Sequence, residues 1–195
     1  MSSQVAMLKN SGVKAIVVAG SPTQTASVAA VNASIGLDVP MLGSSSSFVP
    51  QLLGTPAGPA LEKNLTVTQS FEPFAGTSAG ATAVRAAYLA KHDTEPNGFL
   101  TWAYMEAKVY VAIVKQACEK GDLTRQGLQK AAQQISDLST DGITGNLNFS
   151  APGSPATRQS LIAKVDKKAK GGLTVIQKLS VSKLAEEYKV PSERS

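Results

Sequence analysis

The stretch that decides the fold is residues 13–24, which read Val-Lys-Ala-Ile-Val-Val-Ala-Gly-Ser-Pro-Thr-Gln. Its centre, residues 15–19, is a continuous apolar run without polar alternation, which is typical of a strand buried on both faces of a parallel sheet with helices above and below. The run ends at Gly20, and Ser21 or Thr23 can cap a helix expected over about residues 24–34. A strand, a turn and a helix in this order predict a βα unit.

The same unit repeats farther along the chain. Residues 39–43 predict a second short strand, followed by four serines at 44–47 and a short helix through Leu53, and residues 65–69 alternate in the manner of a third strand. Three strands with two helical connections in about 70 residues predict an α/β fold with a parallel, doubly wound sheet. In such sheets ligands bind beyond the carboxyl ends of the strands, so the candidate loops are residues 20–23, 44–47 and 70–74.

The second half of the chain is expected to be helical first and extended later. Helices are predicted over about residues 78–91, 99–119 and 124–137, and extended segments over residues 142–150, 158–165 and 172–177. The long helix carries apolar side chains at three- to four-residue steps, and Cys118 on it is predicted to be a small core residue. From Ser180 onward we expect a tail with one short helical pattern at residues 184–188.

Composition excludes several classes of protein. With 43% hydrophobic and 17% charged residues, the 195-residue chain is too apolar for a disordered protein or a coiled coil, and its length predicts one domain and part of another. The net charge is +5, but no aromatic residues are interleaved with the late lysines, which favours a solvated face over a nucleic-acid site. One cysteine excludes an intrachain disulfide and a multi-cysteine zinc site. No apolar run reaches ~18 residues, and residues 1–12 have no export-signal pattern.

One motif resembles catalytic machinery. Residues 76–80 match Gly-x-Ser-x-Gly, the nucleophile elbow of serine hydrolases, with Ser78 at its centre. An elbow needs a strand directly before the serine, whereas residues 73–75 intervene here. His92, the only histidine, would lie at the far end of the same helix, roughly 20 Å away at the helical rise. We therefore interpret Ser78 as a helix N-cap and His92 as a solvated residue near a helix end, and a hydrolase is the weakest alternative.

The remaining signals favour a binding module over an enzyme. Neither glycine-rich phosphate-binding pattern is present, and the sequence has no spaced cluster of metal ligands, so no catalytic residue, metal or cofactor is expected. The candidate loops instead hold hydroxyl groups and backbone amides that suit the carboxylate or hydroxyls of a small polar ligand. These hydroxyls belong to Ser21, Thr23, Ser44, Ser45 and Ser46. A merely flexible loop at residues 44–47 is the open alternative.

Several stretches, in order along residues 4–178, resemble the extracytoplasmic solute-binding proteins of branched-chain amino-acid ABC transporters. The resemblance implies a type I periplasmic-binding fold, in which two α/β lobes close on a ligand by hinge motion and present it to a membrane permease. An alternative with the same fold is the ligand-sensing domain of a regulator. The stretches that carry the resemblance are residues 13–24, 39–43, 99–104, 121–128, 142–149 and 171–176.

The resemblance also implies an arrangement of lobes, with this chain as the C-terminal portion. Residues 1–97 and 147–179 would form the second ligand-binding lobe, incomplete, and residues 98–146 the hinge crossing and the helices that pack on the first lobe. Residues 180–195 would be a tail. The family is extracytoplasmic, although this chain carries no export signal. If the first lobe is absent, helix faces through Val111, Val114 and Ile135 would be exposed and would promote self-association.

Finally, the resemblance implies a set of ligand contacts. Ser45 stands where amino-acid-binding members have a glutamate that pairs with the ammonium group of the ligand, and a hydroxyl cannot neutralise a buried ammonium. This weighs against an α-amino acid and places a carboxylate, amide or hydroxylated ligand on an equal footing with it. The expected ligand is an amino acid or a related small polar organic acid or amide, bound without nucleic acid or cofactor. Trp102 and Tyr104 would form an aromatic wall of the cleft or brace the hinge. The full set of implied contacts is Ser21, Pro22, Thr23, Ser44, Ser45, Ser46, Trp102 and Tyr104.

Overall fold

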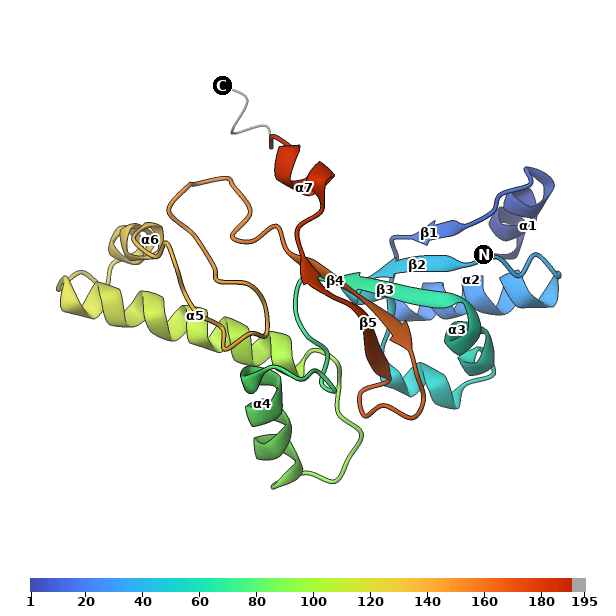
Figure 1. Cartoon of the computed structure of the whole chain (residues 1–195), viewed down its shortest axis with the longest axis horizontal. Coiled ribbons are helices and arrows are strands. Elements are labelled where there is room, and N and C mark those ends of the chain that lie inside the picture. The colour runs from blue at the N-terminus through green and yellow to red at the C-terminus, as the bar shows by residue number, and fades with distance from the viewer. Residues whose placement is uncertain (191–195) are drawn as a thin grey trace.

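A mixed five-stranded sheet organises the computed structural model of the chain, which describes residues 1–190 (Figure 1). The strands lie in chain order, β1 (Ile16–Val18), β2 (Met41–Ser44), β3 (Leu65–Gln69), β4 (Ser160–Val165) and β5 (Leu173–Ser180). The pairs β1–β2 and β2–β3 are parallel, whereas β3–β4 and β4–β5 are antiparallel. The α/β class and the three parallel strands predicted from the sequence are confirmed, and the last two strands add an antiparallel extension.

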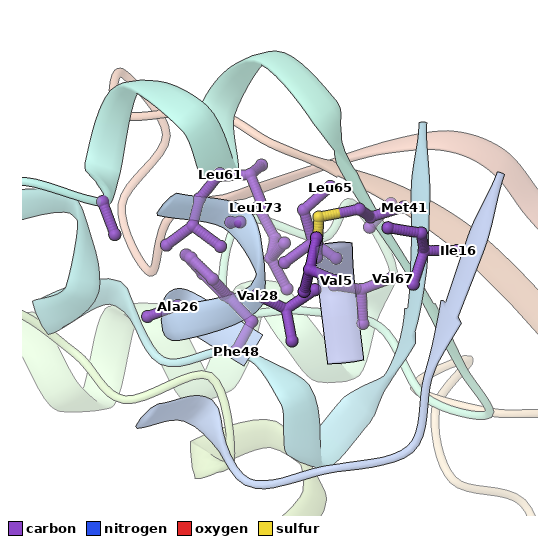
Figure 2. Close-up of a cluster of buried hydrophobic side chains, with 14 of the residues drawn as sticks. Val5, Ile16, Ala26, Val28, Met41, Phe48, Leu61, Leu65, Val67 and Leu173 are labelled. Atoms are coloured by element: carbon purple, nitrogen blue, oxygen red, sulfur yellow. The ribbon is translucent and has the colours of Figure 1, made fainter. Parts of the chain in front are cut away.

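Three helices cover one face of this sheet. They are α1 (Ser2–Asn10), α2 (Pro22–Ser34) and α3 (Gly58–Asn64), and the last two run along one side of the strands in Figure 1. Figure 2 shows the resulting core, in which Val5 of α1 and Val28 of α2 meet Met41, Leu65 and Val67 of the strands. Five such side chains, each at most 8% exposed, lose nearly all their contact with water, which is the main stabilising contribution of a core.

The start of α2 follows the sequence prediction closely. The Ser21 hydroxyl accepts a hydrogen bond from the Gln24 backbone N–H, and the Gln24 side chain accepts one from the Ser21 N–H at 2.9 Å. This reciprocal capping box satisfies two backbone donors that the helix itself leaves unpaired. Pro22 occupies the first turn, where its missing N–H costs nothing.

The prediction that residues 15–19 are buried on both faces of the sheet is wrong. Ile16 points into the core and is 7% exposed, but Val17 points to the opposite face and is 79% exposed. The reason is that α1, α2 and α3 all lie on one face, and the neighbouring residue on the other face, Leu42, is exposed as well. The apolar run was correctly assigned to a strand, but its environment depends on which helices are present.

Helix α3 was not predicted. Residues 54–59, Gly-Thr-Pro-Ala-Gly-Pro, have the composition of a turn, yet the helix begins at Gly58 with Pro59 in its first turn. Proline fits there because its fixed φ suits a helix start. The short helix expected before Leu53 is instead two 3₁₀ segments, η1 (Ser45–Ser47) and η2 (Pro50–Gly54).

A second group of helices lies beside the sheet, α4 (Ala79–Leu89), α5 (Leu100–Glu119) and α6 (Arg125–Gln133). Their junction with the sheet is a small buried cluster of Phe71, Val84 and Ile143. Two hydrogen bonds tie the junction together: the Thr101 hydroxyl donates to the Glu72 carbonyl oxygen at 2.6 Å, and the Glu72 N–H donates to the Ile143 carbonyl oxygen at 2.7 Å. The long helix predicted at residues 99–119 is confirmed.

Side-chain burial on α5 differs in part from the prediction. Cys118, expected in a core, is exposed, because α6 packs against α5 and the buried position is the preceding residue, Ala117. One residue along a helix turns the side chain by about 100°, enough to leave the contact. Val111 and Val114 are exposed as expected, at 67% and 46%, whereas Ile135 is half-buried.

The C-terminal part of the chain agrees with the prediction near residue 184 and differs from it at residues 142–150. Residues 142–150 were expected to be extended, but between residues 134 and 159 the only ladder is an isolated bridge between Leu138 and Leu147. The predicted helical pattern near residue 184 is a short helix, α7 (Lys183–Glu187). The Arg158 guanidinium donates to the carbonyl oxygens of Ala185 and Tyr188 at 2.8 Å each, which holds α7 in place. Of the predicted tail, residues 191–195 lie outside the described residues.

Candidate functional site

The first two candidate loops lie side by side, because β1 and β2 are parallel neighbours and both loops follow their carboxyl ends. The Ser47 hydroxyl joins them by donating to the Val18 carbonyl oxygen at 3.3 Å. Ser47 also accepts a hydrogen bond from the Ser44 N–H at 3.1 Å. The four serines therefore form a hydrogen-bonded 3₁₀ turn against the end of β1 rather than an irregular loop.

The hydroxyl groups of these loops are not equally available. Those of Ser44 and Ser46 lie 3.0 Å apart and hydrogen-bond to each other. Ser45 is half-buried between them, and its hydroxyl makes no hydrogen bond within residues 1–190. In the first loop, Ser21 and Thr23 are exposed, and the Ser21 oxygen accepts from the backbone, so its proton stays free to donate. Each hydroxyl can both donate and accept, so these loops can bind an anionic or hydroxylated group of a ligand.

Acidic side chains are absent from the first two loops, residues 19–24 and 44–49. The third loop contributes Glu72, whose carboxylate accepts a hydrogen bond from the Ser78 N–H at 2.9 Å. Gly76 is required beside it, because a Cβ there would lie 2.4 Å from the Glu72 carboxylate oxygen. Glu72 also lines a hollow of about 280 Å³ together with Lys178 of β5. These two opposite charges line one hollow without forming an ion pair in the described part of the chain. The position of Lys178 beside Glu72 could not be predicted from the sequence.

Arg85 of α4 binds the backbone of the segment that follows β3. Its guanidinium donates to the carbonyl oxygens of Phe74 at 3.0 Å and of Gly76 at 2.8 Å. Two carbonyl groups that would otherwise need solvent are satisfied by one planar fork of donors. Sequence analysis did not identify Arg85. The available signal was an arginine near the start of the helix that follows the Gly-rich segment, residues 76–80.

Trp102 and Tyr104 lie on the first turns of α5, which lies beside the sheet on the side away from β1 (Figure 1). The Trp102 ring stands edge-on to the Phe99 ring, with centroids 6.2 Å apart. Tyr104 lines a shallow hollow of about 330 Å³ on the surface of α5, with Ala107 and Val111. The structure thus brings together Ser21–Thr23 and Ser44–Ser46, and it places the two aromatic residues elsewhere.

The catalytic alternative finds no support in the geometry. The Ser78 hydroxyl accepts a hydrogen bond from the Ala81 N–H at 3.2 Å, so Ser78 is the N-cap of α4, as predicted. His92 is exposed, also as predicted, and its ring packs on that of Tyr88 with centroids 4.8 Å apart. Within residues 1–190, no three His, Cys, Asp or Glu side chains are grouped to hold a metal ion. No helix in that part of the chain combines the length and apolarity that a membrane crossing requires.

A sequence model of periplasmic binding proteins matches residues 1–171, which is most of the chain. The chain belongs to the periplasmic binding protein family. Among solved structures it is similar to a fatty acid ABC transporter substrate-binding protein from Thermomonospora curvata, with 36% identity and a TM-score of 0.91. That match covers 98% of this chain and 49% of the other. A search of curated proteins found no match.

Two further structures share the fold of this periplasmic binding protein. One is a branched-chain amino acid ABC transporter protein from Thermus thermophilus with bound valine, at 17% identity and a TM-score of 0.75 over 95% of this chain and 50% of that one. The other is a leucine binding protein from Thermotoga maritima, at 18% identity and a TM-score of 0.70 over 92% and 48%. This periplasmic binding protein chain therefore spans about half the length of these structural relatives.

Proposed function

We propose that this chain is part of the solute-binding component of an ABC importer, which captures a small organic solute outside the cytoplasm and delivers it to a membrane permease. The observation that carries the proposal is the match, over nearly the whole chain, to a substrate-binding protein of an ABC transporter. The geometry is consistent with it, since the hydroxyl-rich loops gather at the carboxyl ends of adjacent parallel strands, where α/β proteins bind ligands.

The proposed division into lobes follows the two buried clusters. The larger cluster combines residues 5–67 with residues 161–173, all within the proposed second lobe of residues 1–97 and 147–179. The smaller cluster sits where the proposed hinge segment, residues 98–146, begins and ends, and it includes Ile143 and Phe99. A hinge needs a few junction residues that absorb backbone rotation while the lobes stay rigid, and the junction near Glu72, Thr101 and Ile143 is a compact candidate.

For the ligand, we infer a group that carries a carboxylate and no ammonium. Neither serine loop contains a carboxylate that could pair with a buried ammonium, and an unpaired buried charge costs several kcal/mol. The hydroxyl of Ser45 and the exposed hydroxyls of Ser21 and Thr23 can instead donate to carboxylate oxygens. The relative at 36% identity is named for fatty acids, which fits this chemistry. An acyl carboxylate is thus the first ligand class to test, and α-amino acids the second.

Trp102 supplies a reporter for the test. It is the only tryptophan in the chain, and its side chain is 38% exposed on α5, so its fluorescence responds to a change of environment near the proposed hinge. Titration of the 195-residue chain with octanoate, palmitate, L-leucine and L-valine should give a saturable response with a fatty acid. Calorimetry on the same solutions measures the affinity.

The substitution Ser45→Glu sharpens the test, because it places a carboxylate where the proposal needs a neutral donor. It should weaken binding of octanoate by about tenfold or more, since each factor of ten corresponds to about 1.4 kcal/mol, and should favour L-leucine. Ser34→Glu is the matched control, since it adds the same charge at an exposed site at the end of α2. Equal effects of the two substitutions, or the absence of saturable binding for every probe, would contradict the proposal.

A further inference from the structure

A hollow beside β5 is lined by charged and polar side chains that keep free binding capacity. It measures about 280 Å³ and lies between the segment that follows β3 and the outer strand β5. One carboxylate oxygen of Glu72 accepts a hydrogen bond from the Ser78 N–H, and the other has no partner within residues 1–190. In the same part of the chain, the Thr77 hydroxyl and the Lys178 ammonium group also have none. An anion, a hydroxyl and a cation thus line one hollow.

The wall formed by residues 72–77 is held in place by the fold. Arg85 donates to the carbonyl oxygens of Phe74 at 3.0 Å and of Gly76 at 2.8 Å. Because a Cβ at Gly76 would lie 2.4 Å from the Glu72 carboxylate, glycine leaves the space that this carboxylate occupies. Glu72 is therefore positioned before any ligand arrives, and groups positioned in advance lose little freedom on binding.

The wall formed by β5 is irregular at the same place. Val175 pairs with Ala163 and Ser180 pairs with Ser160, so β5 takes five residue steps where β4 takes three. Such bulges redirect side chains and are common at sheet edges and beside functional sites. Strict alternation would point two successive residues to opposite faces, whereas Val175 and Ile176 both line the hollow. The bulged strand thus adds apolar surface beside the charged groups.

We propose that this hollow binds a small ω-amino acid, a zwitterion whose ammonium and carboxylate groups are separated by a short aliphatic chain. The ammonium group would donate to Glu72 and Thr77, and the carboxylate would accept from Lys178. The aliphatic chain would cover Val175 and Ile176. Pockets for small molecules usually measure ~300–1,000 Å³, so a hollow of about 280 Å³ suits a ligand at the small end of this range.

The two charges favour a zwitterion over a singly charged ligand. A simple carboxylate would be attracted by Lys178 and repelled by Glu72, and for a simple amine the two effects would be reversed. Glu72 and Lys178 also do not pair with each other, so each keeps its charge available to a ligand. A ligand with both charges, held apart, satisfies both groups at once.

The hollow is separate from the serine loops. β1 and β5 form opposite edges of the described sheet, and the serine loops follow β1 and β2. No residue that lines the hollow belongs to residues 20–23 or 44–47. The inference therefore concerns a second ligand, and it stands or falls independently of the solute proposed for the serine loops.

Amide NMR spectra of the 195-residue chain, recorded during titration with ε-aminocaproate, test the proposal. The signals of Thr77, Ile176 and Lys178 should shift and saturate, whereas those of residues 44–46 should stay in place. Hexanoate and hexylamine have the same chain length and carry one charge each. Each of them should bind at least tenfold more weakly than ε-aminocaproate.

Two substitutions remove one charge each. Lys178→Gln and Glu72→Gln should both weaken binding of ε-aminocaproate by tenfold or more. Lys178→Gln should also remove the preference for ε-aminocaproate over hexylamine, because the cation that repels an amine is gone while Glu72 remains. Glu72→Gln should keep the melting temperature, since the amide oxygen of glutamine can still accept from the Ser78 N–H.

Lys170→Gln and Glu119→Gln are the controls, because they make the same charge changes at exposed positions outside the hollow. They should leave binding unchanged. The proposal is overturned if ε-aminocaproate gives no saturable shift at the hollow, or if hexanoate or hexylamine binds to the unsubstituted chain as tightly. Equal effects of Lys178→Gln and Lys170→Gln, or of Glu72→Gln and Glu119→Gln, would also overturn it. Failure of the fatty-acid titration would not bear on any of these outcomes.

Discussion

Single hydroxyl groups start three of the main helices of this chain. Ser21, Ser78 and Thr124 each accept a hydrogen bond from a backbone N–H three residues later, at the first turn of α2, α4 and α6. The sequence predicted Ser78 as a cap and Ser21 as one of two candidate caps, because capping is a local interaction between residues close in the chain. Ser78 lies at the centre of a Gly-x-Ser-x-Gly motif, and its hydrogen bond to the Ala81 N–H shows that it caps a helix there.

The role of Ser78 is testable by substitution. Ser78→Ala removes the acceptor for the Ala81 N–H and should lower the free energy of unfolding by about 1 kcal/mol, as measured by urea denaturation. Ser78→Asp should retain most of the stability because aspartate also caps helices. If Ser78→Ala instead abolished a measurable esterase activity without loss of stability, the interpretation of Ser78 as a structural cap would fail.

At the scale of elements, Arg85 of α4 holds the loop that follows β3. Arg85→Met keeps much of the aliphatic stem but leaves the carbonyl oxygens of Phe74 and Gly76 without their donor. Hydrogen bonds to charged groups contribute roughly 1.5–3 kcal/mol, so we expect a loss of stability in that range for the partly exposed pair. Lys91→Met at the exposed end of the helix is the control. Unchanged stability and unchanged hydrogen exchange in residues 72–78 would contradict this role.

The turn between β4 and β5 predicts a pH dependence. The backbone N–H of Lys168 and then the hydroxyl of Thr174 donate to Asp166, at 2.9 and 2.8 Å, and these bonds hold the pKa of Asp166 below its ordinary value of 3.8. The contribution of Asp166 to stability is therefore present above pH 3.8 and is lost as the pH falls through the lower pKa of the folded state. Asp166→Asn should flatten the melting-temperature profile below pH 4, and an unchanged profile would count against it.

At the scale of the whole molecule, the exposed side of α5 should make the chain self-associate. Val111 and Val114 are 67% and 46% exposed, and Tyr110 beside them is 64% exposed. Exposed apolar side chains gathered on one helix promote association. Sedimentation velocity should show oligomers that increase with concentration, and the double substitution Val111→Lys and Val114→Lys should shift the chain to monomer while preserving the helix. A monomer at all concentrations, before any substitution, would show that the surface is tolerated by water.

The candidate site was predicted in part. Parallel neighbours bring their carboxyl-end loops together, so the meeting of residues 20–23 with residues 44–47 followed from the order of the elements. The hydrogen bond between the Ser47 hydroxyl and Val18 could not be predicted, nor could the buried Asn32, whose side chain pairs with the backbone of Val39 on the approach to β2. Both depend on where a side chain points once distant segments have packed.

By itself, the sequence determined the parts of this protein that depend on neighbours in the chain: the strands near residues 16, 41 and 65, the helix caps, and the α/β class. Their periodicity and capping patterns are local. Only the tertiary structure decided that β4 and β5 run antiparallel, that Cys118 faces water, and that Val17 lies on an uncovered face. These outcomes depend on which elements pack against which, and a valine in a strand carries the same local signal whether or not a helix lies over it.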